Sequence, residues 1–90
     1  MKTRFFPFVS DVSKIKELDL PTPETILQLL FVLSEQYGKE MKTLLLTEDN
    51  RLHPDMIVLL NGRHIEFVNG EESKLIDEDT VSFFSRIAGG

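Results

Sequence analysis

The fold of this 90-residue chain is decided by the stretch Met56-Ile57-Val58-Leu59-Leu60-Asn61-Gly62-Arg63-His64-Ile65-Glu66-Phe67. Two mainly apolar runs, 56–60 and 63–67, flank Asn61-Gly62, a pair that is typical of the two-residue type I′ turn. The pattern predicts a β-hairpin, because this turn needs positive φ at both central residues. A second pair, Asn69-Gly70, is expected to end the hairpin.

Side chains alternate along a strand, so the sequence also predicts which residues face the core. In the second hairpin strand we expect Ile65 and Phe67 to point inward, and His64 and Glu66 to point outward. A last strand is predicted over 80–84, with its side chains placed as follows: Val81 and Phe83 inward, Ser82 and Phe84 outward.

The outward Phe84 is a candidate anchor for a partner protein, because aromatic residues dominate interface energetics. His64, which is also expected to face outward, is assigned to the same partner surface. The alternatives are a single exposed apolar residue and an ordinary surface histidine.

Two strands are predicted near the N-terminus, over 2–9 and 14–20, paired as a hairpin across a polar turn at 10–13. Pro7 could shorten or bulge the first strand, because proline cannot donate a hydrogen bond to a neighbouring strand. The last strand of the chain is expected to lie beside the first.

A helix is predicted between Thr22 and Gly38. Thr22 suits the N-cap, Pro23 the first helical position and Gly38 a left-handed C-cap. The apolar residues between these ends recur at helical spacing and are expected to form one buried stripe: Ile26, Leu29, Leu30, Leu33 and Tyr37, widened by Leu27 and Phe31.

Residues 39–47 are predicted to form a short helical turn, 48–55 a loop, and 71–79 an acidic connector anchored by Leu75 and Ile76. The order of elements predicts an α+β architecture in a single domain. We expect that domain to span 1–85 and a flexible C-terminal tail to span 86–90.

Composition argues against several functions. The net charge of −5 disfavours nucleic acid and anionic membrane surfaces, which need clustered basic residues. No apolar run approaches the roughly 20 residues that span a bilayer, and no signal peptide is recognised, so a cytoplasmic location is expected. The absence of cysteine removes thiolate nucleophiles. His53 and His64 lack metal-ligand spacing, so no metal is expected.

The candidate functional segment is Arg86-Ile87-Ala88-Gly89-Gly90. Glycine has no Cβ, so a Gly-Gly end is slim and pliable, and five extended residues reach roughly 17 Å. Such an end can enter a narrow channel and present the Gly90 carboxylate to a partner's active site. A merely frayed terminus is the alternative.

Three stretches resemble the MoaD/ThiS family of ubiquitin-like sulfur carriers: Val58-Leu59-Leu60-Asn61-Gly62-Arg63, Asp79-Thr80-Val81-Ser82-Phe83-Phe84 and Ala88-Gly89-Gly90. The length and the paired phenylalanines are most similar to the MoaD branch, the small subunits of molybdopterin synthase. The resemblance implies a β-grasp (ubiquitin-like) fold, a mixed sheet with one main helix packed across it.

The resemblance also implies a carrier with no catalytic side chains of its own. A MoeB-like enzyme would use ATP to adenylate the Gly90 carboxylate, and a sulfur donor would convert the product to a thiocarboxylate. With the tail inserted, the sulfur would reach a precursor in a MoaE-like large subunit of molybdopterin synthase, in molybdenum or tungsten cofactor biosynthesis. The carrier itself would bind no cofactor.

One departure from the MoaD pattern keeps other functions open. MoaD-like tails commonly carry Pro-Pro after the phenylalanines, where this chain has Ser85-Arg86. A different acceptor, in thiamine synthesis or tRNA thiolation, is therefore an alternative. Arg86 is also similar to the arginine in the tail of ubiquitin, which keeps open a protein modifier joined through Gly90. A non-covalent interaction module with an idle tail is the third possibility.

Overall fold

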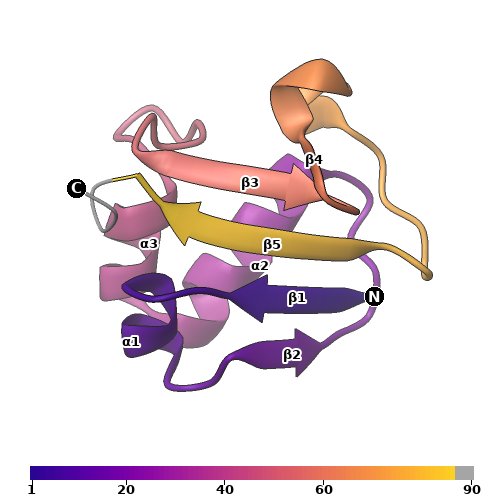
Figure 1. Cartoon of the computed structure of the whole chain (residues 1–90). Coiled ribbons are helices and arrows are strands. Elements are labelled where there is room, and N and C mark those ends of the chain that lie inside the picture. Colours follow the sequence, from indigo (N-terminus) through magenta and orange to yellow (C-terminus); the bar gives the residue numbers. More distant parts are fainter. Residues whose placement is uncertain (87–90) are drawn as a thin grey trace.

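The structure is a computed structural model that describes residues 1–86. A five-stranded sheet carries the helices on one face (Figure 1). Its order is β2-β1-β5-β3-β4, with the bounds β1 (Lys2–Phe5), β2 (Glu17–Asp19), β3 (Met56–Leu60), β4 (Arg63–His64) and β5 (Thr80–Ser85). β1 and β5 pair in parallel, as expected for the first and last strands, and the other pairs are antiparallel. This mixed sheet confirms the predicted β-grasp fold.

The helical elements are α1 (Val9–Ser13), α2 (Ile26–Tyr37), α3 (Lys39–Leu45) and the 3-10 turns η1 (Ile65–Phe67) and η2 (Gly70–Glu72). The predicted stripe of α2 is buried at Ile26, Leu29, Leu30 and Leu33 and packs in one core with the inner side chains of the sheet. Leu27 and Tyr37 are only half-buried, and Phe31 is 40% exposed because it lies on the side of α2 that turns away from the sheet. Within residues 1–86, no helix is both long and apolar enough to cross a membrane.

The first strand is shorter than predicted. β1 ends at Phe5, and residues 9–13, expected to be the end of a strand and a polar turn, form α1 instead. Pro7 explains the difference, because it cannot donate to the adjacent strand and the chain turns there. Phe8 follows with φ of 79°, a backbone conformation that is rare for a bulky residue.

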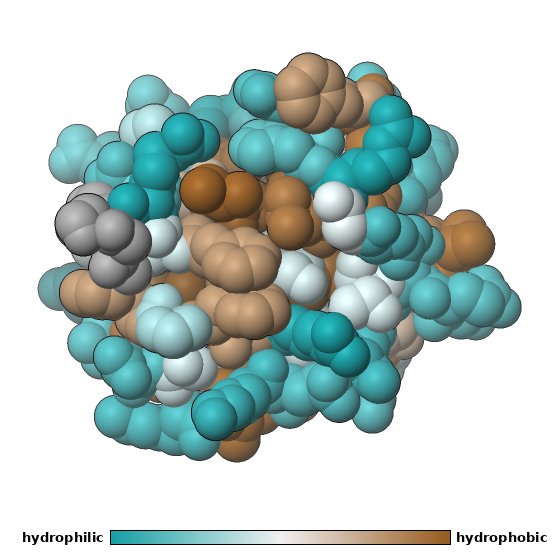
Figure 2. Space-filling model, viewed as in Figure 1, coloured by the Kyte–Doolittle hydropathy of each residue, from teal (hydrophilic) through white to brown (hydrophobic). Residues whose placement is uncertain are grey.

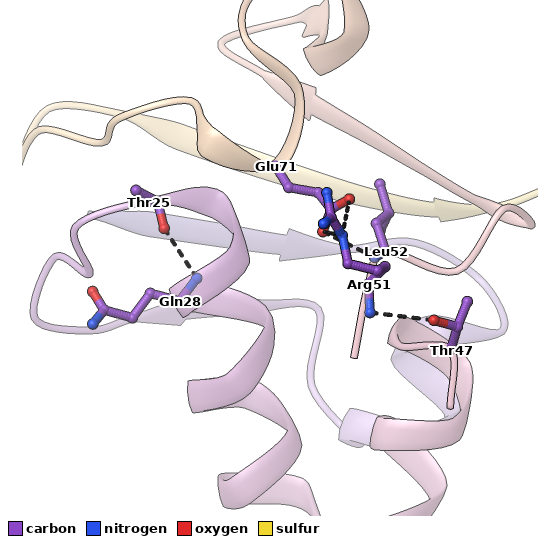
Figure 3. Close-up of polar contacts among 6 residues, drawn as sticks. All are labelled: Thr25, Gln28, Thr47, Arg51, Leu52 and Glu71. Atoms are coloured by element: carbon purple, nitrogen blue, oxygen red, sulfur yellow. Dashed lines mark hydrogen bonds and ion pairs between the residues drawn. The ribbon is translucent and has the colours of Figure 1, made fainter. Parts of the chain in front are cut away.

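The start of α2 also differs from the prediction. Thr25, rather than Thr22, is the N-cap, and its side-chain oxygen accepts a hydrogen bond from the Gln28 N–H at 3.2 Å (Figure 3). The segment before the helix is held extended by pairing with the connector: the Leu75 N–H donates to the Glu24 carbonyl at 3.1 Å. A contact with a distant segment therefore outweighs the local preference for a helix at Pro23.

Gly38 ends α2, as predicted, but with a different backbone. Its φ is +88° and its ψ is −164°, so it lies outside the left-handed helical region and leads directly into α3. Only glycine adopts such a conformation without strain. The helical turn that the sequence predicts after it is confirmed by α3.

The Asn61-Gly62 turn is confirmed as type I′ by φ values of 51° and 86°. The prediction that the second strand of the hairpin extends beyond His64 is wrong, since η1 begins at Ile65. Ile65 is still buried, but Phe67 is 70% exposed rather than inward. β4 is an edge strand of only two residues, so β3 alone could hold the chain extended past His64, and its pairing with β4 ends there.

The last strand follows its predicted alternation. Val81 and Phe83 are fully buried, whereas Ser82 and Phe84 lie on the opposite face of the sheet. In the connector, Leu75 is buried as predicted. Ile76 is 60% exposed, so only one of the two expected anchors reaches the core.

Candidate functional site: the end of β5 and the outer face of the sheet

The C-terminal end of β5 lies beside the start of β3, at the same end of the molecule as α1 and α3 (Figure 1). Arg86, the last described residue, is tied to the loop before β3, since its backbone N–H donates to the Asp55 carbonyl at 2.6 Å. That loop is itself ordered, because the Asp55 N–H donates to Nδ1 of His53 at 3.0 Å. These contacts fix the backbone of Arg86 against the loop before β3.

Phe84 lies on the outer face of the sheet, the face without helices. Its ring stacks on Phe6, with centroids 4.0 Å apart and planes at 16°, and it pairs in register with Ile57 of β3. With Leu59, these half-buried residues form what we call the outer patch: Phe6, Ile57, Leu59 and Phe84. Apolar atoms gather at the centre of this face (Figure 2). The sequence indicated Phe84 but not its aromatic partner Phe6, which comes from the opposite end of the chain.

His64 lies on the same face, in register with Leu59 and two strands away from β5. Its Nδ1 accepts a hydrogen bond from the Glu66 N–H at 3.2 Å, and its ring meets the exposed Phe67 edge-on at 6.2 Å. The structure therefore places His64 and Phe84 on one surface but not in contact. The role of either residue in binding a partner stays a prediction.

Two surface depressions flank the end of β5. Phe8, Val12 and Leu44 supply apolar groups to the first, which Ser85 also lines. His64 and Glu71 line the second, together with Arg86. Both bring together segments that are distant in sequence, and no local pattern pointed to either.

A carboxylate clamp holds the loop that precedes β3. Glu71 of η2 accepts hydrogen bonds from Nε of Arg51, at 3.2 Å to each of its oxygens, and from the Leu52 N–H at 3.2 Å (Figure 3). The Glu71 side chain is only 16% exposed. The clamp positions the loop that runs on to Asp55 and so to the exit of the tail.

Replacing Glu71 by alanine is expected to lower the free energy of unfolding by about 2 kcal/mol, because charged hydrogen bonds and the partner of a half-buried N–H are lost together. Urea denaturation measures this loss. Glu72→Ala is the matched control: Glu72 is exposed and its side chain has no polar partner within residues 1–86, so we expect a change below about 0.5 kcal/mol. Equal losses in both variants would contradict the role of the clamp.

The other predicted site residues, Ile87, Ala88, Gly89 and Gly90, lie outside the described residues. The division into a domain at 1–85 and a tail at 86–90 therefore stays a prediction. Within residues 1–86, no group of three or more histidine, aspartate or glutamate side chains could hold a metal ion. Burial raises the pKa of the Tyr37 phenol above its usual value. This ring packs edge-on against the core residue Phe5, so we assign Tyr37 a structural role and not one in the candidate site.

The fold and this site define a small ubiquitin-like protein with a half-buried apolar patch on its outer sheet face and a C-terminal strand that ends at the surface. A sequence model of the Urm1 (ubiquitin related modifier) family matches residues 7–90. The chain belongs to this family. The expectation of a ubiquitin-like family is confirmed, whereas the narrower likeness to MoaD stays a prediction.

Individual relatives agree with this assignment. A protein of Archaeoglobus fulgidus, provisionally described as a sulfur carrier, is 33% identical over 66 residues, which cover 73% of this chain and 74% of the relative. Urm1 of Trypanosoma brucei is 29% identical with a TM-score of 0.81, over 99% of this chain and 93% of that chain. Small archaeal modifier protein 1 of Methanosarcina acetivorans shares the fold, with a TM-score of 0.86 at 23% identity, over 99% and 94% of the two chains.

The same fold occurs in a protein complex. A chain of the BexX/CysO complex of Amycolatopsis orientalis superposes with a TM-score of 0.80 at 19% identity, over 99% of this chain and 98% of that chain.

Proposed function

We propose that this protein is a sulfur carrier that works through the carboxylate of Gly90. An ATP-dependent adenylating enzyme, MoeB-like in its chemistry, activates this carboxylate, and a sulfur donor then replaces the adenylate to leave a thiocarboxylate. The observation that carries the proposal is the Gly89-Gly90 sequence that follows β5, a strand that ends at the surface. The family and the provisionally described sulfur carrier among the relatives support it.

The chemistry explains why activation is needed. A carboxylate is a poor electrophile, so a mixed anhydride with adenylate must form before sulfur can attack. Residues 86–90 would enter the active site of the enzyme, and two glycines would pass where side chains could not. The described residues would supply a binding surface. An enzyme that holds the tail would contact the folded domain at the outer patch and at the end of β5.

The acceptor of the sulfur is a further proposal. Transfer to a pterin precursor, with this chain as the small subunit beside a MoaE-like large subunit, is one possibility. Transfer in thiamine synthesis or to a tRNA base are others. The likeness to a chain of the BexX/CysO complex supports action together with a partner enzyme, without indicating which one.

Intact-mass spectrometry tests the proposal. We expect the purified protein, incubated with ATP, an adenylating enzyme and a sulfur donor, to gain the mass difference between one sulfur and one oxygen. Alkylation should then add one alkyl group to the thiocarboxylate, and hydrolysis should restore the starting mass. The starting mass also establishes whether Gly90 ends the mature protein. A protein that ends elsewhere, or one that none of the organism's adenylating enzymes modifies, would refute the proposal.

A protein modifier is the second candidate, favoured by the match to the ubiquitin related modifiers. It shares the activation step but ends with an amide bond between Gly90 and a lysine of a target. Tryptic peptides that carry the remnant Ile87-Ala88-Gly89-Gly90 on lysine, left by cleavage after Arg86, found in cells with the protein and missing from cells without it, would establish this role. Absence of such peptides together with sulfur transfer would leave the carrier role alone.

A further inference from the structure

The chain holds two Asn-Gly pairs, and the fold treats them differently. In any Asn-Gly pair the backbone nitrogen of glycine can attack the preceding side-chain amide, since no Cβ shields it. We propose that Asn69 is a site of spontaneous deamidation in this protein, whereas Asn61 is protected by its surroundings. This inference does not depend on the proposed function.

Asn61 is held at three points. Its Nδ2 donates to Oδ1 of Asp79 at 2.8 Å, and its Oδ1 accepts from the Thr80 N–H at 2.9 Å. Its own N–H donates to the Thr80 carbonyl at 2.8 Å. Asp79 is itself buried and accepts a second bond from the Ile76 N–H. The carboxamide of Asn61 must break two bonds before it can rotate toward the nitrogen of Gly62.

Asn69 lacks this restraint. Both asparagines are exposed, but the Asn69 carboxamide has no hydrogen-bond partner within residues 1–86. Only its backbone is bonded: the N–H donates to Oγ of Ser73 at 2.9 Å, and the carbonyl accepts from the Glu72 N–H at 3.2 Å. These contacts belong to the 3-10 turn η2, and none of them involves the carboxamide of Asn69. Rotation of the Asn69 side chain is therefore unhindered, and opening of the turn brings Gly70 within reach.

The reaction needs no partner other than water. The nitrogen of Gly70 forms a bond to Cγ of Asn69, and the C–Nδ2 bond breaks, so that ammonia leaves with the proton from the Gly70 N–H. Water then opens the resulting succinimide at either carbonyl. One product is aspartate, and the other is isoaspartate, in which the main chain runs through the former side chain and is longer by one methylene group.

The turn that would be modified, η2, also contains Glu71, the residue that forms the carboxylate clamp. Gly70 precedes Glu71, whose carboxylate holds Arg51 and Leu52. A longer main chain at Asn69 shifts this turn, and the new carboxylate adds negative charge beside Glu71. Deamidation is therefore expected to loosen the loop that leads to Asp55 and to the exit of the tail.

Peptide mapping of the aged full-length protein tests the inference. In mildly alkaline buffer we expect Asn69 to deamidate at least about tenfold faster than Asn61, because breaking hydrogen bonds slows the latter. In concentrated urea the two rates should become similar, since both sites then present the same dipeptide in an unfolded chain. The ratio of the two deamidation rates in the folded protein is the deciding measurement. Equal rates, or faster deamidation at Asn61, would overturn the proposal.

A variant connects the chemistry with its consequence. Asn69→Gln removes the reactive pair but keeps an exposed amide, so the variant should not age at this position. We expect aged wild-type protein to melt at a lower temperature than fresh protein, and aged Asn69→Gln to melt where it did when fresh. An identical decrease in both proteins would show that deamidation at Asn69 does not loosen the clamp.

Discussion

A chain shortened to end at Ala88 is expected to accept no sulfur at its new carboxylate, with a rate of activation at least about 100-fold below that of the full chain. Removal of Gly89 and Gly90 withdraws the carboxylate by up to about 7 Å. It also places a Cβ beside the reacting group. Misplacement of a reacting atom by even one ångström can cost about 100-fold in rate, so the truncation should exceed that loss.

The shortened chain keeps all the helices and strands that the structure describes within residues 1–86, so it should remain folded. Intact-mass spectrometry after incubation with ATP, the adenylating enzyme and the sulfur donor measures the modification, and the melting temperature serves as the check on folding. A chain extended by one alanine after Gly90 is the companion variant and should also fail. Thiocarboxylation of either variant at the rate of the full chain would contradict the role assigned to Gly90.

Replacing Phe84 by alanine is expected to weaken binding to the adenylating enzyme or to the acceptor subunit by about 30-fold, the effect of losing about 2 kcal/mol at a central aromatic contact. Phe84 lies at the base of the tail and stacks on Phe6 in the outer patch. A partner that holds the tail must approach this surface. Titration calorimetry with the purified partner gives the change in Kd.

Phe31→Ala is the matched control. Phe31 is an exposed aromatic residue on α2, on the helical side of the molecule. Its removal should leave binding unchanged. Phe84→Ala also loses a ring stack worth about 1 kcal/mol of stability, so binding must be measured below the melting temperature of both variants. Weaker binding by Phe31→Ala alone would place the partner on the helical side.

Much of the fold could be predicted from the sequence, because several of its features are local. Asn61-Gly62 sets its own turn, and the apolar residues of α2 repeat at the helical period. The alternation in β5 separates Phe83 from Phe84 in the same way. The candidate site was predictable only in part. The outward Phe84 follows from alternation, whereas Phe6 and the two depressions come from segments that no local rule joins.

The predictions from sequence were wrong where a contact with a distant segment competes with a local preference. Thr22 and Pro23 have good helix-start chemistry, yet pairing of Glu24 with Leu75 delays the helix to Ile26. Phe67 continues an apparent strand, but β4 is at the edge of the sheet and the chain turns into η1. Local preferences are worth fractions of a kcal/mol per residue, and tertiary contacts readily exceed them.

The sequence by itself determined the turn, the buried face of the helix and the inward side of the last strand, since each depends on backbone geometry within a few residues. Only the tertiary structure decided that Phe6 stacks on Phe84, that Glu71 holds Arg51, and that one Asn-Gly pair is protected. These contacts depend on strand order and register, which join residues far apart in the chain and which no short stretch encodes.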